Sequence, residues 1–176
     1  MKGLCEIIVV TGYTAGPRWN EAGSGSNYLC LPEHPQWRTY SSGNQSSGSI
    51  MGVEYYRATN GIFSTRNNRW YSLDDKPAPC ALCYVFSRST VAMVPARTQC
   101  PDGWTTEYGG YLVSTATHGT NRKRSSYICL DEAPEVANGP TGIDRAVIFP
   151  VEVTCGSLPC SVYISGRELT CVVCSK

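Results

Sequence analysis

The sequence lacks long apolar runs and has almost no segment that could form a helix. Its apolar stretches, such as "IIVV", "VAMV" and "AVIFPV", fall far short of the roughly 20 residues that cross a bilayer. Seventeen glycines and eleven prolines interrupt the 176 residues, so runs of helix-forming residues are nearly absent. We therefore expect neither a membrane partner nor a helical fold.

Charge of one sign is also lacking, as are the usual catalytic patterns. Fifteen basic and fourteen acidic side chains give a formal net charge of +1, so no global field draws nucleic acid to the chain. There is no G-x-S-x-G motif, and the adjacent acidic pairs Asp74-Asp75 and Asp131-Glu132 are typical of turns. The sequence predicts a protein that is not an enzyme and has no nucleic-acid partner.

Histidine is scarce. His34 and His118 are the only two, and both lie in loop-like sequence without neighbouring ligands at metal spacing. We expect no metal site and no cofactor.

Short β-like segments account for most of the remaining chain. They are rich in Val, Ile, Tyr and Thr and are bounded by Gly, Pro and Ser clusters. The expected strands are 6–11, 28–31, 50–56, 91–94, 110–115, 127–130, 146–154 and 168–173. The predicted fold class is all-β.

The chain contains ten cysteines. This large, even number favours an oxidising compartment with paired sulfurs. Cys80 and Cys83 form one C-x-x-C pair, and Cys171 and Cys174 form another at the end of the chain. A four-cysteine zinc site usually brings its pairs within roughly 15 to 20 residues, and a redox centre needs a helix after its first cysteine. Neither condition is met, so structural disulfides are the favoured interpretation.

An internal repeat explains why there are two such pairs. Gly12-Tyr13 returns as Gly110-Tyr111, "YLCL" at 28–31 returns as "YICL" at 127–130, and Val53-Glu54 returns as Val151-Glu152. The two C-x-x-C pairs then close two copies of one module. We expect a tandem duplication, with a first module at 1–84 and a second at 85–176, intimately packed as one domain.

The spacing within a C-x-x-C pair limits its bonding. In an extended segment, residues three apart are separated by roughly 10 Å and point to opposite faces, so each cysteine needs a separate partner. Each module offers two candidates in the same places, Cys5 and Cys30 in the first and Cys100 and Cys129 in the second, and spacing does not choose between nested and swapped pairings. Cys155 and Cys160 flank a short turn and are expected to form a local bridge.

Several strings resemble a known family. "NYLCLP", "PCALC", "DGW", "CGSLPC" and the ending "GRELTCVVCSK" are similar to the C-terminal non-collagenous domain of short-chain, spongin-type invertebrate collagens. The same order of motifs is more distantly similar to the duplicated C-terminal domain of type IV collagen, although the first module has no counterpart of Cys155 and Cys160 and the chain contains no Gly-x-y repeat.

The resemblance implies a nested disulfide pairing and an assembly function. The implied pairs are Cys5–Cys83, Cys30–Cys80, Cys100–Cys174 and Cys129–Cys171. It also implies a secreted, non-enzymatic extracellular-matrix module that self-associates, with a trimer as the expected assembly, or binds other matrix proteins, with a targeting segment upstream of this chain. The alternative is a secreted carbohydrate-binding, lectin-like module on the same scaffold.

Aromatic and basic residues in polar loops are the candidate binding surface. It comprises Trp37, Arg66, Arg69, Trp70 and Tyr71, whereas Trp104, beside a cysteine, is expected in the core. Asn44 begins a glycosylation sequon in a Gly/Ser loop. Arg122, Lys123 and Arg124 are expected to form a solvated loop.

Overall fold

The computed structural model describes residues 6–20, 23–43, 45, 47–56, 61–64, 72–116, 124–142 and 145–176. These residues contain nine β-strands and no helix, and hence no helix that could span a membrane. The strands are β1 (Ile7–Gly16), β2 (Leu29–Pro32), β3 (Met51–Tyr55), β4 (Pro79–Tyr84), β5 (Val91–Pro95), β6 (Thr105–Ser114), β7 (Ile128–Asp131), β8 (Ala146–Pro150) and β9 (Thr170–Ser175). The all-β prediction is confirmed.

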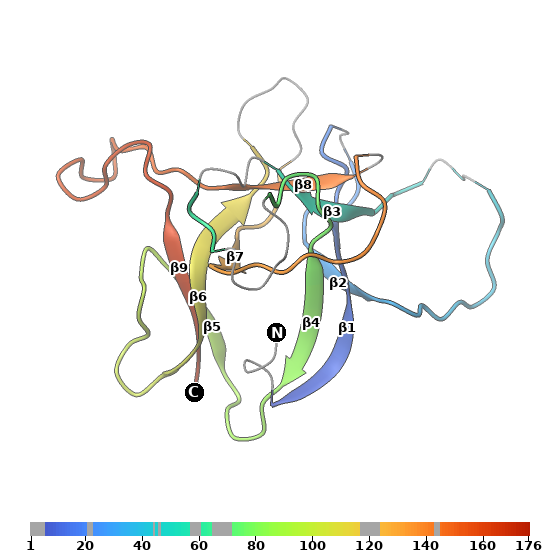
Figure 1. The fold of residues 1–176 in the computed structure, drawn as a ribbon, viewed down its shortest axis with the longest axis horizontal. Helices are drawn as coiled ribbons and strands as arrows, with labels where there is room; N and C mark the ends of the chain where they lie inside the picture. The colour runs from blue at the N-terminus through green and yellow to red at the C-terminus, as the bar shows by residue number, and fades with distance from the viewer. Residues whose placement is uncertain are drawn as a thin grey trace.

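All nine strands belong to one curled sheet. Its strand order is β2-β1-β3-β8-β6-β9-β5, with β4 also paired to β1 and β7 also paired to β6. In Figure 1, β1 and β4 form one side of the molecule, β5, β6 and β9 form the other, and β3 and β8 lie between them at one end. The parallel β3–β8 pair joins the two sides.

The backbone repeats the duplication found in the sequence. β1 pairs with β2, β3 and β4 as β6 pairs with β7, β8 and β9. Even the irregularities repeat, since β1 shifts register between Ile8 and Val10 and β6 does so between Thr106 and Tyr108. An isolated bridge joins Glu54 to Pro77, and its counterpart joins Glu152 to Glu168. The two modules are therefore two copies of one four-stranded unit.

The repeated Gly-Tyr pairs have a steric cause. A Cβ atom on Gly12 would lie 1.8 Å from the carbonyl oxygen of Leu31, and one on Gly110 would lie 1.8 Å from that of Leu130. In both modules the long strand must approach its short neighbour so closely that only glycine fits.

The main core draws on both modules. Val53, Tyr55 and Phe63 from the first pack with Val113 and Ile148 from the second, and all are buried. The Tyr55 hydroxyl donates a hydrogen bond to the Glu135 carbonyl oxygen at 2.6 Å. Because neither module encloses this core alone, the two are packed as one unit.

Disulfides hold each module at equivalent places. The structure contains Cys30–Cys80, Cys100–Cys174, Cys129–Cys171 and the local Cys155–Cys160 bridge. These pairs confirm the nested arrangement in the second module and the inner pair of the first. Cys83 is also disulfide-bonded, and the expected pairing with Cys5 involves a residue outside the described part of the chain.

Several predicted strand boundaries were wrong. β6 begins at Thr105 rather than at 110, because its polar first half pairs with β9. β8 ends at Pro150, and beyond it only Glu152 makes a bridge. β4 was not predicted at all, because "PCALCY" is short and its cysteines and alanine have little strand preference.

Candidate functional site

A groove lies between the two modules, and we call it the central groove. Its volume is about 410 Å³. It is lined by Thr14, Tyr28, Leu29, Cys30, Cys80, Met93, Tyr108, Tyr127, Ile128, Cys129 and Val173.

The duplication gives the groove two similar walls. Tyr28 stands immediately before β2, and its repeat, Tyr127, stands immediately before β7. The disulfide Cys30–Cys80 contributes to one wall, and Cys129 contributes to the other. The lining is therefore aromatic, aliphatic and sulfur-rich on both sides.

Two of the three tyrosines that line this groove, Tyr28 and Tyr108, have hydrogen-bond partners for their hydroxyls. Tyr28 Oη lies 2.6 Å from Ser125 Oγ, and Tyr108 donates to the Cys129 carbonyl oxygen at 3.1 Å. Burial raises the pKa of Tyr28, although the Ser125 hydrogen bond opposes the rise. Burial also raises the pKa of Tyr108, and the charge of Asp131 adds to it. Both stay neutral near pH 7 and suit packing against an apolar or planar ligand face rather than proton transfer.

An ion cluster ties the modules together at the end where β3 meets β8. Arg145, just before β8, bonds Glu54 Oε2 at 2.6 Å and also pairs with Asp75. Glu54 is only 4% exposed and accepts a second bond from the Gly142 N–H at 2.8 Å. Burial tends to lower the pKa of Arg145, but its bonds to the two carboxylates outweigh this and raise it. The guanidinium also lies over the Tyr56 ring, 5.2 Å from its centroid.

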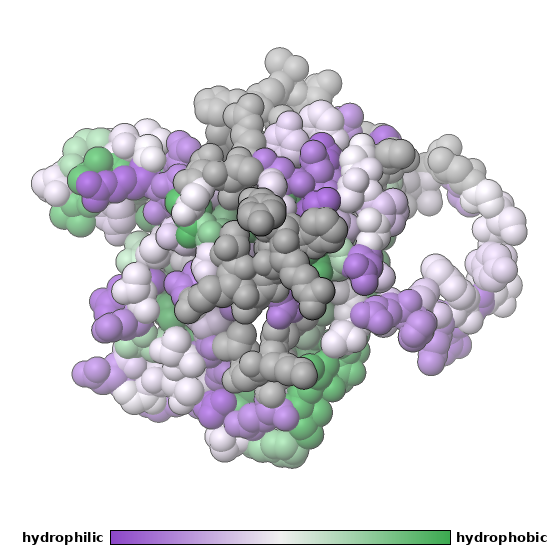
Figure 2. Space-filling view, viewed as in Figure 1, coloured by the Kyte–Doolittle hydropathy of each residue, from purple (hydrophilic) through white to green (hydrophobic). Residues whose placement is uncertain are grey.

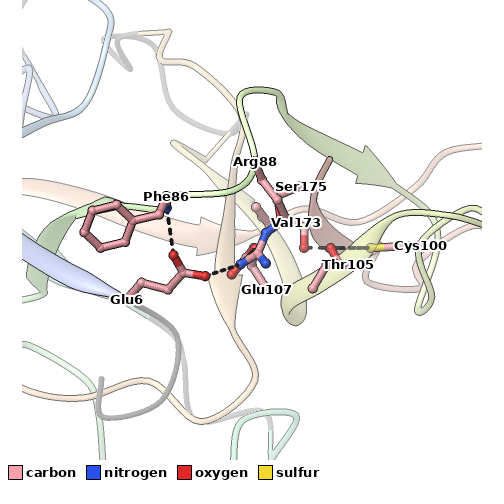
Figure 3. A network of polar contacts seen from close by, with 8 residues as sticks. All are labelled: Glu6, Phe86, Arg88, Cys100, Thr105, Glu107, Val173 and Ser175. Carbon is pink, nitrogen blue, oxygen red and sulfur yellow. Dashed lines mark hydrogen bonds and ion pairs between the residues drawn. The ribbon is translucent and has the colours of Figure 1, made fainter.

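A second arginine bridges the modules near the start of β1. Figure 3 shows Arg88 between Glu6 of the first module and Glu107 on β6 of the second, at 3.3 and 3.2 Å. Glu6 also accepts a hydrogen bond from the Phe86 N–H at 2.7 Å. In both clusters the charged side chains form ion pairs with one another across the boundary between the modules. We therefore interpret these clusters as links that hold the modules together rather than as a catalytic site.

Exposed apolar residues gather at the far ends of β1 and β4, and we call this cluster the apolar corner. Figure 2 shows it as a green area at the lower right of the molecule. Its members are Ile7 (44% exposed), Ile8 (47%), Val9 (55%), Leu82 (54%), Tyr84 (53%) and Phe86 (68%). The rings of Tyr84 and Phe86 pack edge to face, with centroids 5.1 Å apart.

A second exposed apolar cluster surrounds the Cys155–Cys160 bridge. It consists of Leu158, Val162 and Ile164, and Figure 2 shows it at the upper left, across the molecule from the apolar corner. Val162 is the most exposed of the three, at 71%.

The structure describes few of the predicted binding residues. Trp37 is 76% exposed in the loop between β2 and β3 and lines neither the central groove nor the apolar corner. The others lie outside the described residues: Arg66, Arg69, Trp70, Tyr71, Asn44, His118, Arg122 and Lys123.

Three further predictions concern described residues. His34 and Arg124 are exposed. Trp104 is half-buried rather than part of the core, because it follows the turn at Gly103 at the periphery of the second module. Within the described part of the chain, no group of three or more His, Cys, Asp or Glu residues could hold a metal ion.

Sequence reasoning missed both the central groove and the apolar corner. The groove had a signal, since the duplicated strings "YLCL" and "YICL" both begin with a tyrosine that we assigned to a strand. The apolar corner had a weaker one, the absence of any charged residue from 77 to 87. Comparison of the chain with protein-family models and with solved structures finds no match.

Proposed function

We propose that this protein is a non-enzymatic, secreted extracellular-matrix module that mediates protein assembly through self-association. The observation that carries the proposal is the apolar corner, six exposed apolar side chains contributed by β1, β4 and the residue Phe86 beyond them. Contiguous apolar surface of this kind is typical of protein interaction sites.

The disulfide framework supports an extracellular setting. Every described cysteine is disulfide-bonded, and such bonds persist in oxidising compartments. The resemblance of "CGSLPC" and "GRELTCVVCSK" to collagen C-terminal domains adds the matrix context. The non-enzymatic part rests on the central groove, whose described lining contains tyrosines but no histidine or carboxylate.

Sedimentation velocity over a concentration series, in non-reducing buffer, tests this function. We expect the sedimentation coefficient to rise with protein concentration, and to rise further in sodium sulfate, because sulfate strengthens apolar association. A single monomeric species at every concentration, with and without sulfate, would overturn the proposal.

A carbohydrate-binding function is the second candidate, and the tyrosines of the central groove favour it. Sugar rings stack on aromatic faces, and Tyr127 is 62% exposed at this groove. A glycan array with the parent protein, Tyr127→Ala and Tyr40→Ala separates the two functions. Binding that is lost in Tyr127→Ala and kept in Tyr40→Ala, whose residue is 73% exposed in the β2–β3 loop, would establish the lectin-like alternative.

A further inference from the structure

In the second module, the outer edge of the C-x-x-C strand β9 is paired with another strand, β5. β9 lies between β6 and β5, and β5 runs antiparallel to it with Val94 opposite Val172 and Ala92 opposite Cys174. Thr90 and Lys176, which directly follows β9, exchange two backbone hydrogen bonds of 3.0 Å. Because backbone groups alternate in direction along a strand, the N–H and C=O groups of the even-numbered residues of β9 also point toward β5. An added antiparallel strand thus completes this side of the second module.

The equivalent side of the first module has no such strand among the described residues. β4 pairs with β1 and with no other described strand. The Thr14 N–H donates to the Ala78 carbonyl oxygen at 2.9 Å, so by alternation Leu82 points its backbone groups toward β1 and Ala81 points its own away. Ala81 occupies the position that Val172 occupies in β9, where β5 is added.

Beyond Pro79, at which β4 begins, this edge carries none of the usual protection against strand addition. Natural edge strands are commonly guarded by charged side chains, bulges or internal prolines. No charged residue occurs from 77 to 87, and the register shift of this ladder lies in β1, between Ile8 and Val10, rather than in β4. The charged groups described nearby, Glu6 and Arg88, already pair with each other.

We propose that β4 is an interaction edge that pairs antiparallel with β4 of a second copy of this chain. Pairing of a strand with its own copy about a two-fold axis consumes both edges and closes the assembly as a dimer, in place of the trimer that the resemblance implies. The other described strands that border a single neighbour carry charge or proline at their C-terminal ends: β2 ends at Pro32 before Glu33, β7 ends at Asp131, and β5 ends at Pro95. β4 has its one proline at its first residue, Pro79, and its remaining residues, 80–84, contain neither charge nor proline. This pairing specifies the surface of the proposed self-association and rests on it.

The pairing places Leu82 opposite the partner's Leu82. Because the backbone groups of Leu82 point inward to β1, the two-fold axis passes through a non-hydrogen-bonded pair, in which opposing side chains approach most closely. Leu82 and Tyr84 of the apolar corner then pack against the partner copy on one face, together with Ile7, because Ile7 lies opposite Tyr84 in the β1–β4 ladder.

A charge-swap experiment tests this geometry. Leu82→Lys and Leu82→Glu are each expected to weaken dimerisation by about tenfold or more, because like charges would face each other across the axis. An equimolar mixture of the two variants is expected to recover association, as a heterodimer, because opposite charges then face each other. Sedimentation and native mass spectrometry measure both results.

Val162→Lys is the matched control, because Val162 is apolar and exposed in the second cluster, across the molecule from β4. It is expected to leave association unchanged. Backbone amide exchange adds a direct readout, with the Ala81 amide becoming protected as the parent concentration rises.

The outcomes separate the two proposals. A parent that never associates overturns the assembly function and the β4 pairing together. A parent that associates, but is weakened by Val162→Lys and not by either Leu82 variant, keeps the assembly function and overturns the β4 pairing. Association that weakens in both Leu82 variants but is not recovered in their mixture overturns the two-fold register.

Discussion

Strands β4 and β9 occupy the same place in the two modules, yet they lie in different environments. Both carry a C-x-x-C pair, and both run antiparallel to the long strand of their module. Cys171, Val172, Cys174 and Ser175 of β9 are completely buried, whereas Leu82 and Tyr84 of β4 are more than half exposed. The difference comes from neighbours rather than from the strand itself, because β5 covers β9.

The largest expected difference in stability between the two modules concerns their equivalent inner disulfides, Cys30–Cys80 and Cys129–Cys171. Replacing both cysteines of Cys129–Cys171 by alanine should lower the free energy of unfolding by about 2–5 kcal/mol, as is typical for native bridges. Replacing Cys30 and Cys80 should cost about 1 kcal/mol less, because Cys171 is completely buried and its replacement also leaves a cavity.

Loop length does not explain that difference. The bridges span 42 and 50 positions, so their chain-entropy contributions are nearly equal and slightly favour the first module. Denaturant unfolding of the two double variants measures the gap. If the first-module variant lost as much unfolding free energy as the second-module variant, or more, then the covering of β9 by β5 would not change how much its disulfide contributes to stability.

The next comparison between the modules concerns two equivalent glutamates, Glu54 and Glu152. Glu54 is buried and bonds Arg145 and the Gly142 N–H, whereas its repeat, Glu152, is exposed. Glu54→Gln should lower the free energy of unfolding by about 1.5–3 kcal/mol, the range for hydrogen bonds to charged groups. Glu152→Gln should change it by less than about 0.5 kcal/mol, since exposed substitutions rarely matter. Equal losses in denaturant unfolding would mean that the Arg145 cluster does not fasten the modules.

The buried tyrosines of the central groove predict a smaller effect that is confined to alkaline pH. Burial raises the pKa of Tyr28 and Tyr108 above the unfolded value of about 10, so the unfolded state releases these protons first. Their contribution to stability is complete below that value and is lost as pH rises through the folded-state pKa values. Ultraviolet titration of tyrosinate, with unfolding measured at each pH, should show this decline, and Tyr28→Phe should reduce it. A decline that is already complete at neutral pH would exclude these tyrosines as its cause.

The sequence predicted the duplication well because close packing imposes it on individual residues. Gly12 and Gly110 repeat because a Cβ atom would collide with the neighbouring strand, and the cysteines repeat because they bridge equivalent strands. The parallel pairing of β3 with β8 could not be predicted, since no local pattern in "MGVEY" or "AVIFP" specifies a partner about ninety residues away.

The candidate site was harder to predict for a related reason. Tyr28 and Tyr127 line one groove only because the modules face each other, and that arrangement is a property of the packed pair. The sequence predicts a binding role for Trp37 because aromatic residues in polar loops are often functional, but the structure leaves it 76% exposed and outside both the lining of the central groove and the apolar corner. Local composition thus identified the repeated unit, while the surfaces depend on how two units combine.

The smallest expected effect concerns the monomer itself. Leu82→Lys, measured at a concentration below that of association, should change the free energy of unfolding by less than about 0.5 kcal/mol, because Leu82 is 54% exposed and a lysine there stays in water. Val173→Lys, at the repeated position of β9, should cost about 1–3 kcal/mol, because Val173 lies between β5 and β6 and lines the central groove. Denaturant unfolding of dilute samples compares them. If Leu82→Lys cost as much as Val173→Lys, β4 would be covered within the monomer, and the contrast between the modules that makes β4 an interaction edge would disappear.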